Sequence, residues 1–225
     1  MNKIKFISLT AGVALAMAFT FIMSICSCGS PPKRMTIGEE TVPPVTNAEI
    51  VLTSFTDSRD GKTYKAVKIG EQTWMAENLN YDVEGNKCYD NSPANCKKYG
   101  RLYSWYVAVK VCPSGWHLPS EQEWQTLVNL AGGGSHAGAR LKTASGWNKN
   151  GNGTDNYGFS ALPGGYYDGS FNGDGSHGAW WSATDRPGLL RAYYYGMNYG
   201  NSSAGRGDGH STSTGDYFSV RCVQD

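Results

Sequence analysis

The sequence carries no excess of charge of either sign, because 20 lysine and arginine residues stand against 19 aspartate and glutamate residues. Proteins that bind nucleic acid through its phosphates need a basic excess, so the composition argues against a nucleic-acid partner. After residue 25 no apolar run is long enough to span a bilayer. Phosphate-binding loops, Gly-x-Ser-x-Gly, His-Glu-x-x-His and Cys-x-x-Cys are all missing. These absences remove the common sequence signs of an enzyme.

The first 30 residues have the pattern of a bacterial lipoprotein signal peptide. Lys3 and Lys5 precede an apolar stretch over residues 6–25. The segment Ile25-Cys26-Ser27-Cys28 then resembles a lipobox, in which small residues precede the cysteine that receives the lipid. Cys26 is the alternative acceptor, but it would place Ile25 directly before the cut, where a small residue is needed. A plain transmembrane anchor is the other alternative, and the paired cysteines at the end of the stretch favour lipidation of Cys28.

This interpretation divides the chain into three parts. Residues 1–27 are a signal peptide whose removal leaves 18 basic and 19 acidic residues. Residues 28–56 contain two Pro-Pro pairs and few large apolar groups, which predicts a semi-rigid tether. Residues 57–225 form one folded domain. We expect the protein to be lipid-anchored in the cell envelope, in the outer membrane, facing either the periplasm or the cell surface.

Hydrophobic spacing predicts a hairpin and two helices. The hairpin joins residues 63–69 to 73–75 through Gly70-Glu71. A helix over residues 102–110 follows from apolar side chains at i, i+3, i+4 and i+7. The other helix begins at Ser120, which forms a capping box with Glu123, and ends at the glycines after residue 131. Further strands are expected at residues 158–162, 179–183, 191–197 and 217–223.

Four cysteines remain for the domain once Cys26 leaves with the signal and Cys28 is lipidated. An even number of cysteines in an exported, glycine-rich chain indicates disulfides, for which three connectivities exist. The short polar loop between Cys88 and Cys96 favours a local bridge, which leaves Cys112 with Cys222. A zinc site is the alternative, but no two cysteines have ligand spacing and the four histidines are scattered.

Five phrases in order are distinctive, namely residues 99–105 (YGRLYSW), 112–120 (CPSGWHLPS), 157–165 (YGFSALPGG), 180–184 (WWSAT) and 219–223 (SVRCV). Together they closely resemble the Fibrobacter succinogenes major paralogous domain of exported proteins and lipoproteins in Bacteroidetes and Fibrobacteres. The resemblance covers about residues 57–223. Two of the phrases also look like the formylglycine-generating-enzyme fold, a relative of the C-type lectin domain. The resemblance implies an α+β fold of that type, with two short helices, small antiparallel sheets and long glycine-rich loops, and it supplies no function.

The chemistry of the formylglycine-generating enzymes is not expected here. Those oxidases need free cysteines late in the chain, whereas Cys222 is the only late cysteine here and is expected to pair with Cys112. His117 lies between two apolar residues before the capped helix, so we expect a packed or hydrogen-bonded histidine and no catalytic base. Glu121 and Glu123 are explained by capping and not by acid–base catalysis. We therefore predict no catalytic residues.

No cofactor is predicted, and calcium is the one candidate metal that the resemblance raises. Loop oxygens at Asp155 and Asn156, or at Asn172 and Asp174, could bind it, although such residues in glycine loops usually form turns. The sugar-site phrases of lectins, Glu-Pro-Asn and Trp-Asn-Asp, do not occur. The integrin-type tripeptide at residues 206–208 is attributed to chance.

The segment 191–217 is the predicted contact surface, because tyrosine, serine, glycine and asparagine are the residues of adaptable binding loops. The candidate ligand-binding residues are Tyr193, Tyr194, Tyr195, Asn198, Tyr199, Asn201, Arg206, Asp208 and His210. Our hypothesis is a non-enzymatic envelope module for binding or adhesion, with a protein or glycan partner. A structural envelope lipoprotein without a discrete ligand is the alternative.

Overall fold

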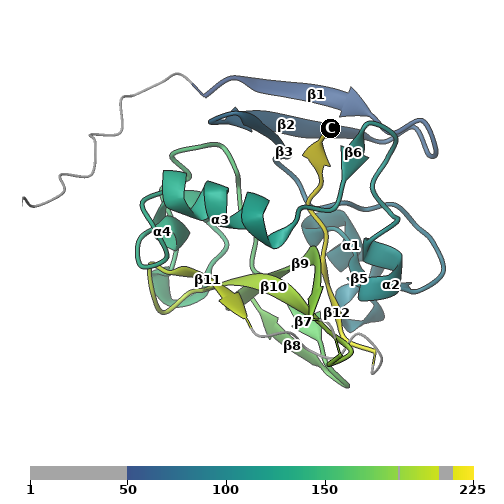
Figure 1. Cartoon of the computed structure of the whole chain (residues 1–225). Coiled ribbons are helices and arrows are strands. Elements are labelled where there is room, and N and C mark those ends of the chain that lie inside the picture. The colour runs from purple at the N-terminus through teal and green to yellow at the C-terminus, as the bar shows by residue number, and fades with distance from the viewer. Residues whose placement is uncertain (1–49, 187, 208–214) are drawn as a thin grey trace, which may run out of the picture. The chain divides into compact units, whose positions relative to one another are not determined.

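Short strands separated by glycine turns form most of the fold. The computed structural model describes residues 50–186, 188–207 and 215–225, which adopt an α+β arrangement (Figure 1). The strands are β1 (Leu52–Thr56), β2 (Thr63–Ile69), β3 (Gln72–Met75), β4 (Asn86–Lys87), β5 (Leu102–Ser104), β6 (Trp116–His117), β7 (Gly164–Tyr167), β8 (Phe171–Asp174), β9 (His177–Arg186), β10 (Arg191–Asn198), β11 (Ala204–Gly207), β12 (Tyr217–Ser219) and β13 (Val223–Gln224). The helices are α1 (Pro93–Tyr99), α2 (Trp105–Ala108), α3 (Glu121–Leu130) and α4 (Ala137–Leu141), with 3₁₀ turns at Tyr89–Asn91 and Asn148–Asn150.

The first sheet has the order β1-β2-β3-β13-β6 and is antiparallel throughout. The predicted hairpin is confirmed as β2 and β3, which turn at Gly70 with a positive φ of 61°. Strand β1 pairs with β2 along its whole length. The sheet therefore begins at Leu52, inside the segment predicted as tether up to residue 56. Phe55 explains the difference, because its ring stacks on Trp116 at 4.2 Å.

The second sheet has the order β11-β10-β9-β7-β12-β5-β4, with β8 paired to β7. Strands β9 and β10 form a long hairpin whose central residues are the strands predicted at 179–183 and 191–197, and both are confirmed. The strand predicted at 217–223 is instead two strands in different sheets. Strand β12 pairs with β5 and β7 in the second sheet, whereas β13 lies between β3 and β6 in the first.

Helix α3 lies between the two sheets (Figure 1). Its predicted capping box is confirmed, because the Glu123 amide donates to Ser120 Oγ at 3.3 Å and the Ser120 amide donates to Glu123 Oε2 at 2.7 Å. On its buried side, the Trp124 ring lies 4.8 Å from Trp74 of the first sheet and stacks on Tyr195 of the second at 5.1 Å. The helix thus joins both sheets into one hydrophobic core.

Two other predicted elements differ in the structure. Residues 102–104 form β5 because Leu102 and Tyr103 pair with β12, so only residues 105–108 of the predicted helix are helical. The strand predicted at 158–162 is a loop with one bridge, between Lys142 and Ala161. There Ser160 has a φ of 54° and donates its amide to Asp155 Oδ1 at 2.7 Å, which is turn geometry.

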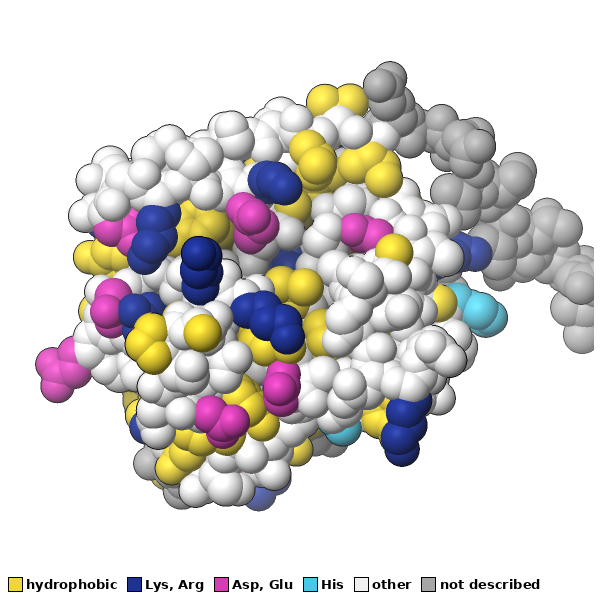
Figure 2. All heavy atoms as spheres, turned by 180° about the vertical axis from the view of Figure 1, so that it is seen from behind, with side chains coloured by type: hydrophobic (Ala, Val, Ile, Leu, Met, Phe, Trp, Pro, Cys, Tyr) yellow, Lys and Arg dark blue, Asp and Glu magenta, His cyan; other side chains and the backbone are white. Residues whose placement is uncertain are grey.

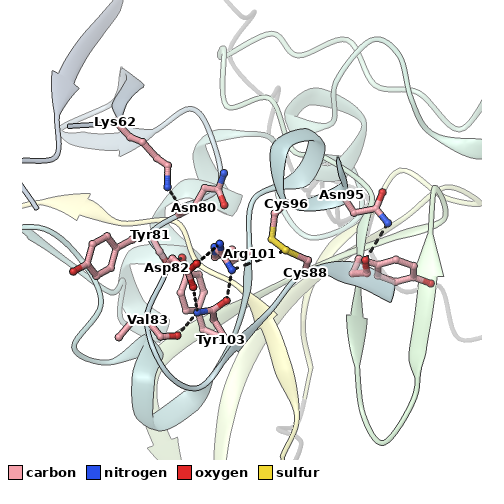
Figure 3. The surroundings of a disulfide bond; sticks show 12 residues. Lys62, Asn80, Tyr81, Asp82, Val83, Cys88, Asn95, Cys96, Arg101 and Tyr103 are labelled. Carbon is pink, nitrogen blue, oxygen red and sulfur yellow. Dashed lines mark hydrogen bonds and ion pairs between the residues drawn. A yellow bond between two sulfur atoms is a disulfide. The ribbon is translucent and has the colours of Figure 1, made fainter. Parts of the chain in front are cut away.

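Both predicted disulfides are confirmed, Cys88 with Cys96 and Cys112 with Cys222. Figure 3 shows the first of them beside Arg101, whose guanidinium pairs with Asp82 at 2.7 Å. None of the helices in the described part of the chain has the length and hydropathy needed to cross a membrane.

A buried arginine lies where the chain passes from β12 to β13. Arg221 is fully buried and donates to Asn78 Oδ1 at 2.8 Å and to the Ser160 carbonyl at 2.7 Å. Burial lowers its pKa to about 9. Asn78 also accepts from the Trp180 indole at 2.9 Å, so this polar cluster joins segments from both sheets.

Candidate functional site

Strand alternation divides the predicted contact residues of β10 between two faces of the second sheet. Tyr195 and Met197 face α3 and the core, whereas Tyr194, Gly196 and Asn198 point the other way. Tyr195 is 2% exposed, and its hydroxyl donates to the Glu121 carbonyl at 3.3 Å. The prediction that Tyr195 belongs to an exposed contact surface is therefore wrong, since its ring is part of the core.

Tyr193 and Arg206 form a separate group on the α3 side of the sheet. The Arg206 guanidinium lies 4.6 Å from the Tyr193 ring and donates to Glu121 Oε1 at 3.2 Å. Glu121 therefore has a cation as its partner and is not paired with Glu123. These contacts neutralise the charge of Arg206 on the side of the sheet away from Tyr194.

The remaining residues of the predicted contact surface lie in different environments. Tyr199 is half-buried against the core, and its hydroxyl accepts from Lys149 at 3.3 Å. Asn201 lies in the β10–β11 loop and accepts from the Ser203 amide at 3.0 Å, which is turn chemistry. Asp208 and His210 lie outside the described residues.

The face of the sheet opposite α3 carries a trough. Across β9, β10 and β11, the strand register aligns Ala179, Gly196 and Gly205 in one row. One flanking row contains Tyr194, and the other pairs His177 with Asn198. Because the central row has only small residues, it forms the floor between two taller walls. The resulting cleft has a volume of about 430 Å³, within the usual range of about 300–1,000 Å³ for small-molecule sites.

The aromatic rings around this cleft are held in place by packing. Tyr194 lies 4.8 Å from Phe218 and covers Gly207, where a Cβ would overlap its ring. Tyr166 closes the β7 end and packs edge-on against both His177 at 6.2 Å and Phe218 at 5.9 Å. Rings that are fixed before binding lose little side-chain entropy when a ligand arrives.

The loop that forms the far rim of the cleft is also anchored. Lys142 is 2% exposed and donates from Nζ to the Asn198 carbonyl at 3.0 Å and the Asn201 carbonyl at 2.9 Å. Burial lowers the pKa of this lysine. The buried side chain therefore holds the turn between β10 and β11 at its start, Asn198, and at its middle, Asn201.

Two glycines of the floor have no conformational or packing reason to be glycine. Neither Gly196 nor Gly205 has a positive φ. A Cβ at Gly205 would meet no described atom within 4 Å, and one at Gly196 would come no closer than 3.5 Å to Tyr194. Glycine inside a strand lowers stability and often marks a place where a ligand comes close to the backbone. Both glycines keep the cleft open.

The polar wall of the cleft is uncharged. The Asn198 amide donates to His177 Nε2, and His177 Nδ1 lies 2.9 Å from Ser176 Oγ. An Nε2 that accepts requires the neutral Nδ1–H tautomer. Burial lowers the pKa of His177 below its ordinary 6.5, which also favours the neutral ring.

His117 is hydrogen-bonded, as predicted. Its Nε2 lies 2.8 Å from Glu123 Oε1 and its Nδ1 lies 2.7 Å from Asp225 Oδ1. Burial by itself would lower the pKa of His117, but the two carboxylates outweigh it and the pKa is raised above 6.5. The imidazole links the start of α3 to the end of the first sheet.

Two of the residues considered for calcium, Asp155 and Asn172, have side-chain hydrogen bonds within the protein. Asp155 accepts from the amide and the hydroxyl of Ser160 at 2.7 and 2.6 Å. Asn172 donates to Asp168 at 2.8 Å, Asp174 is exposed, and the backbone N–H of Asn156 donates to the Arg140 carbonyl at 2.9 Å. Over residues 50–186, 188–207 and 215–225, no group of three His, Cys, Asp or Glu side chains is placed to hold a metal.

A second hollow of about 240 Å³ is lined by Lys62, Lys97 and Lys98 together with Glu77. Lys62 is already paired with Asp60 at 2.9 Å. Figure 2 shows lysine and arginine interspersed with aspartate and glutamate on the face behind Figure 1. Mixed charge of this kind does not attract a polyanion, so the cleft beside Tyr194 is the better candidate site.

The sequence pattern alone did not reveal the cleft. Tyr166, His177, Ala179 and Phe218 come from segments outside or at the edge of the predicted surface, and only the strand register brings them to Gly205. One signal was present, because Gly196 interrupts β10 and glycines alternate with larger residues in β11.

A scan against protein families matches residues 67–224 to the Fibrobacter succinogenes major domain. This span includes every strand from β3 to β13, and both disulfides. No curated protein and no solved structure matches the chain. The chain belongs to the Fibrobacter succinogenes major domain family.

Proposed function

We propose that this protein is a non-catalytic binding module of the cell envelope, held by a lipid on Cys28, that takes its ligand in the cleft beside Tyr194. The observation that carries the proposal is the floor of Gly196 and Gly205. These two glycines lower the intrinsic stability of their strands and leave an open trough between fixed walls. A sheet that served only as a scaffold would gain stability from larger side chains at both positions.

The proposed contact surface differs from the segment 191–217 as a whole. It uses Tyr194 and Asn198 from that segment and adds Tyr166 and His177 from β7 and β9. Tyr193 and Arg206 lie on the other side of the sheet. Arg206 binds Glu121 and packs on the Tyr193 ring, so we assign both residues a structural role.

Two further features support a binding role over an enzymatic one. Cys112 and Cys222 are joined, so the late thiol that an oxidase of the formylglycine-generating type would use is consumed. His117 and Glu123 are engaged with each other and with structural partners. We also infer that the two-sheet α+β fold is of the C-type-lectin-like type, in which compact domains present a binding surface on a fixed framework.

The test is binding of the purified full chain, in detergent, to a panel of immobilised bacterial envelope fractions, matrix proteins and glycans. Gly205→Phe places a ring over Gly196 and fills the floor of the cleft. Ser54→Phe adds the same ring to an exposed position of β1 in the other sheet and is the matched control. We expect the wild type and the control to bind the same partner, and Gly205→Phe to lose it by at least about tenfold.

A chain that binds nothing on the panel, or whose binding survives Gly205→Phe, would contradict the proposal and favour a structural envelope lipoprotein. Circular dichroism and thermal unfolding of each variant show whether the fold is retained. If Gly205→Phe fails to fold, Gly205→Ala serves in its place, with a smaller expected loss. Retained binding in that variant, with the fold intact, would equally count against the proposal.

A further inference from the structure

The cleft beside Tyr194 has one apolar wall and one polar wall that face each other across a flat floor. Tyr194 and Phe218 supply the apolar side. His177 and Asn198 form the opposite side, where the bond to His177 Nε2 uses one of the two N–H groups of the Asn198 amide and leaves the other for a ligand. Between them, Gly196 and Gly205 leave only backbone. A ligand that lies on this floor meets carbon on one side and hydrogen-bonding groups on the other.

The charges around the cleft limit the ligand further. No aspartate or glutamate is among the described residues that line it, which argues against a cationic ligand. Arg206 is the one arginine among the described residues at its border, and its guanidinium points to Glu121 and Tyr193 on the other side of the sheet. His177 is held in its neutral form by Asn198. Among the described residues a phosphate or a carboxylate would therefore find no counter-charge in the cleft, and their chemistry favours an uncharged ligand.

The backbone of the floor excludes a peptide strand as the main mode of binding. The peptide groups of β9, β10 and β11 are paired with one another along this row, so a polypeptide cannot extend the sheet from its face. On the free edge of β11, the Ala204 amide is already bonded to the Gly134 carbonyl at 2.9 Å. The cleft also lacks a deep aliphatic pocket for a peptide side chain, since its floor is glycine and alanine.

From these contacts we propose that the cleft binds an uncharged saccharide, with the C–H face of one sugar ring against Tyr194 and its hydroxyls toward the side-chain amides of Asn198 and Asn201. Sugar rings combine a flat apolar face with hydroxyls that both donate and accept. The Oδ1 of Asn201 accepts from the Ser203 amide, whereas its Nδ2 has no hydrogen-bond partner among the described residues. This inference rests on the proposed binding function.

The experiment uses the purified full chain on an array of neutral gluco-, manno-, galacto- and xylo-oligosaccharides, with sialylated and sulfated glycans and random peptides beside them. We expect at least one neutral oligosaccharide to bind. Gly205→Phe should weaken that binding by at least about tenfold, and Ser54→Phe should leave it unchanged. Asn198→Ala should weaken it as well, with the aromatic wall still present.

Failure of the saccharide inference can be separated from failure of the binding function. On the envelope and matrix panel described above, a Gly205→Phe-sensitive interaction that resists periodate but is destroyed by protease identifies a protein ligand. That result, or binding to the charged glycans alone, would overturn the saccharide inference and leave the binding function standing. Absence of any Gly205→Phe-sensitive interaction overturns both.

Discussion

Replacing Cys112 and Cys222 together with alanine should lower the free energy of unfolding about twice as much as replacing Cys88 and Cys96. The first disulfide closes a loop with a sequence separation of 110 residues and the second one of 8 residues. In the chain-entropy model these loops contribute about 4.8 and about 2.5 kcal/mol at 25 °C, respectively. The Cys112–Cys222 disulfide should therefore contribute about 2 kcal/mol more to the free energy of unfolding than the Cys88–Cys96 disulfide.

The structure gives a second reason to expect this order. Cys222 is fully buried, and its carbonyl accepts from the Met75 amide at 3.0 Å, so the long disulfide fastens β13 into the first sheet. Cys88 and Cys96 join a 3₁₀ turn to α1 at the border of the second sheet. Removing the Cys88–Cys96 bond frees two segments that are neighbours in the chain and that other contacts still hold in place. The loss of stability should therefore be smaller.

The assay is urea unfolding of the two double-alanine variants and the wild type, followed by tryptophan fluorescence and far-ultraviolet circular dichroism. Both probes must give the same midpoint for a two-state treatment. Thiol titration of the unreduced, denatured wild type should find none of these four cysteines free. Equal losses in the two variants, or a larger loss on removing the short loop, would refute the assignment of stability to chain entropy.

Three other predictions concern the floor of the cleft, the histidine at α3 and the anchor. Gly205→Phe should leave the free energy of unfolding unchanged or raise it by about 0.5–1 kcal/mol, because glycine is unfavourable inside a strand; a clear loss in urea unfolding would mean that the glycine is required by the fold. The raised pKa of His117 means that its contribution to stability is complete below about pH 6.5 and is lost as pH rises through the folded-state pKa. The stability difference between wild type and His117→Asn, measured from pH 5.5 to 8.5, should accordingly shrink as pH rises, and a constant or growing difference would contradict the ion-pair geometry. Cys28→Ser should abolish incorporation of labelled fatty acid and release the protein from membranes, whereas Cys26→Ser should retain the label; the opposite pattern would place the lipid on Cys26.

Local signals in the sequence predicted the parts of the fold whose partners are close in the chain. The capping box of Ser120 and Glu123 fixes the start of α3 by two hydrogen bonds over three residues. The turn at Gly70 likewise fixes the β2–β3 hairpin. The disulfide pairing followed from elimination once the loop between Cys88 and Cys96 was taken as local.

The parts that could not be predicted depend on distant partners. Leu102 has helical spacing with the residues after it, yet β12 pairs with it from more than a hundred positions away and makes it a strand. The row of tyrosines at 193–195 suggests one surface, but pairing with β9 and β11 assigns Tyr194 and Tyr195 to opposite faces. The composition of residues 191–217 suggested a binding surface, but only the pairing of β10 with β9 and β11 showed which side chains share one face.

The passage of one short segment through both sheets has a consequence for the order in which the protein acquires its structure. Strand β12 contacts β5, β7 and β9, and β13 separates β3 from β6, so residues 217–224 complete the hydrogen bonding of both layers. A chain from which this segment has not yet been synthesised cannot close either layer. We therefore expect the Cys112–Cys222 bond, and the hydrogen bonding of both sheets, to be completed only when residues 217–224 are available to pair.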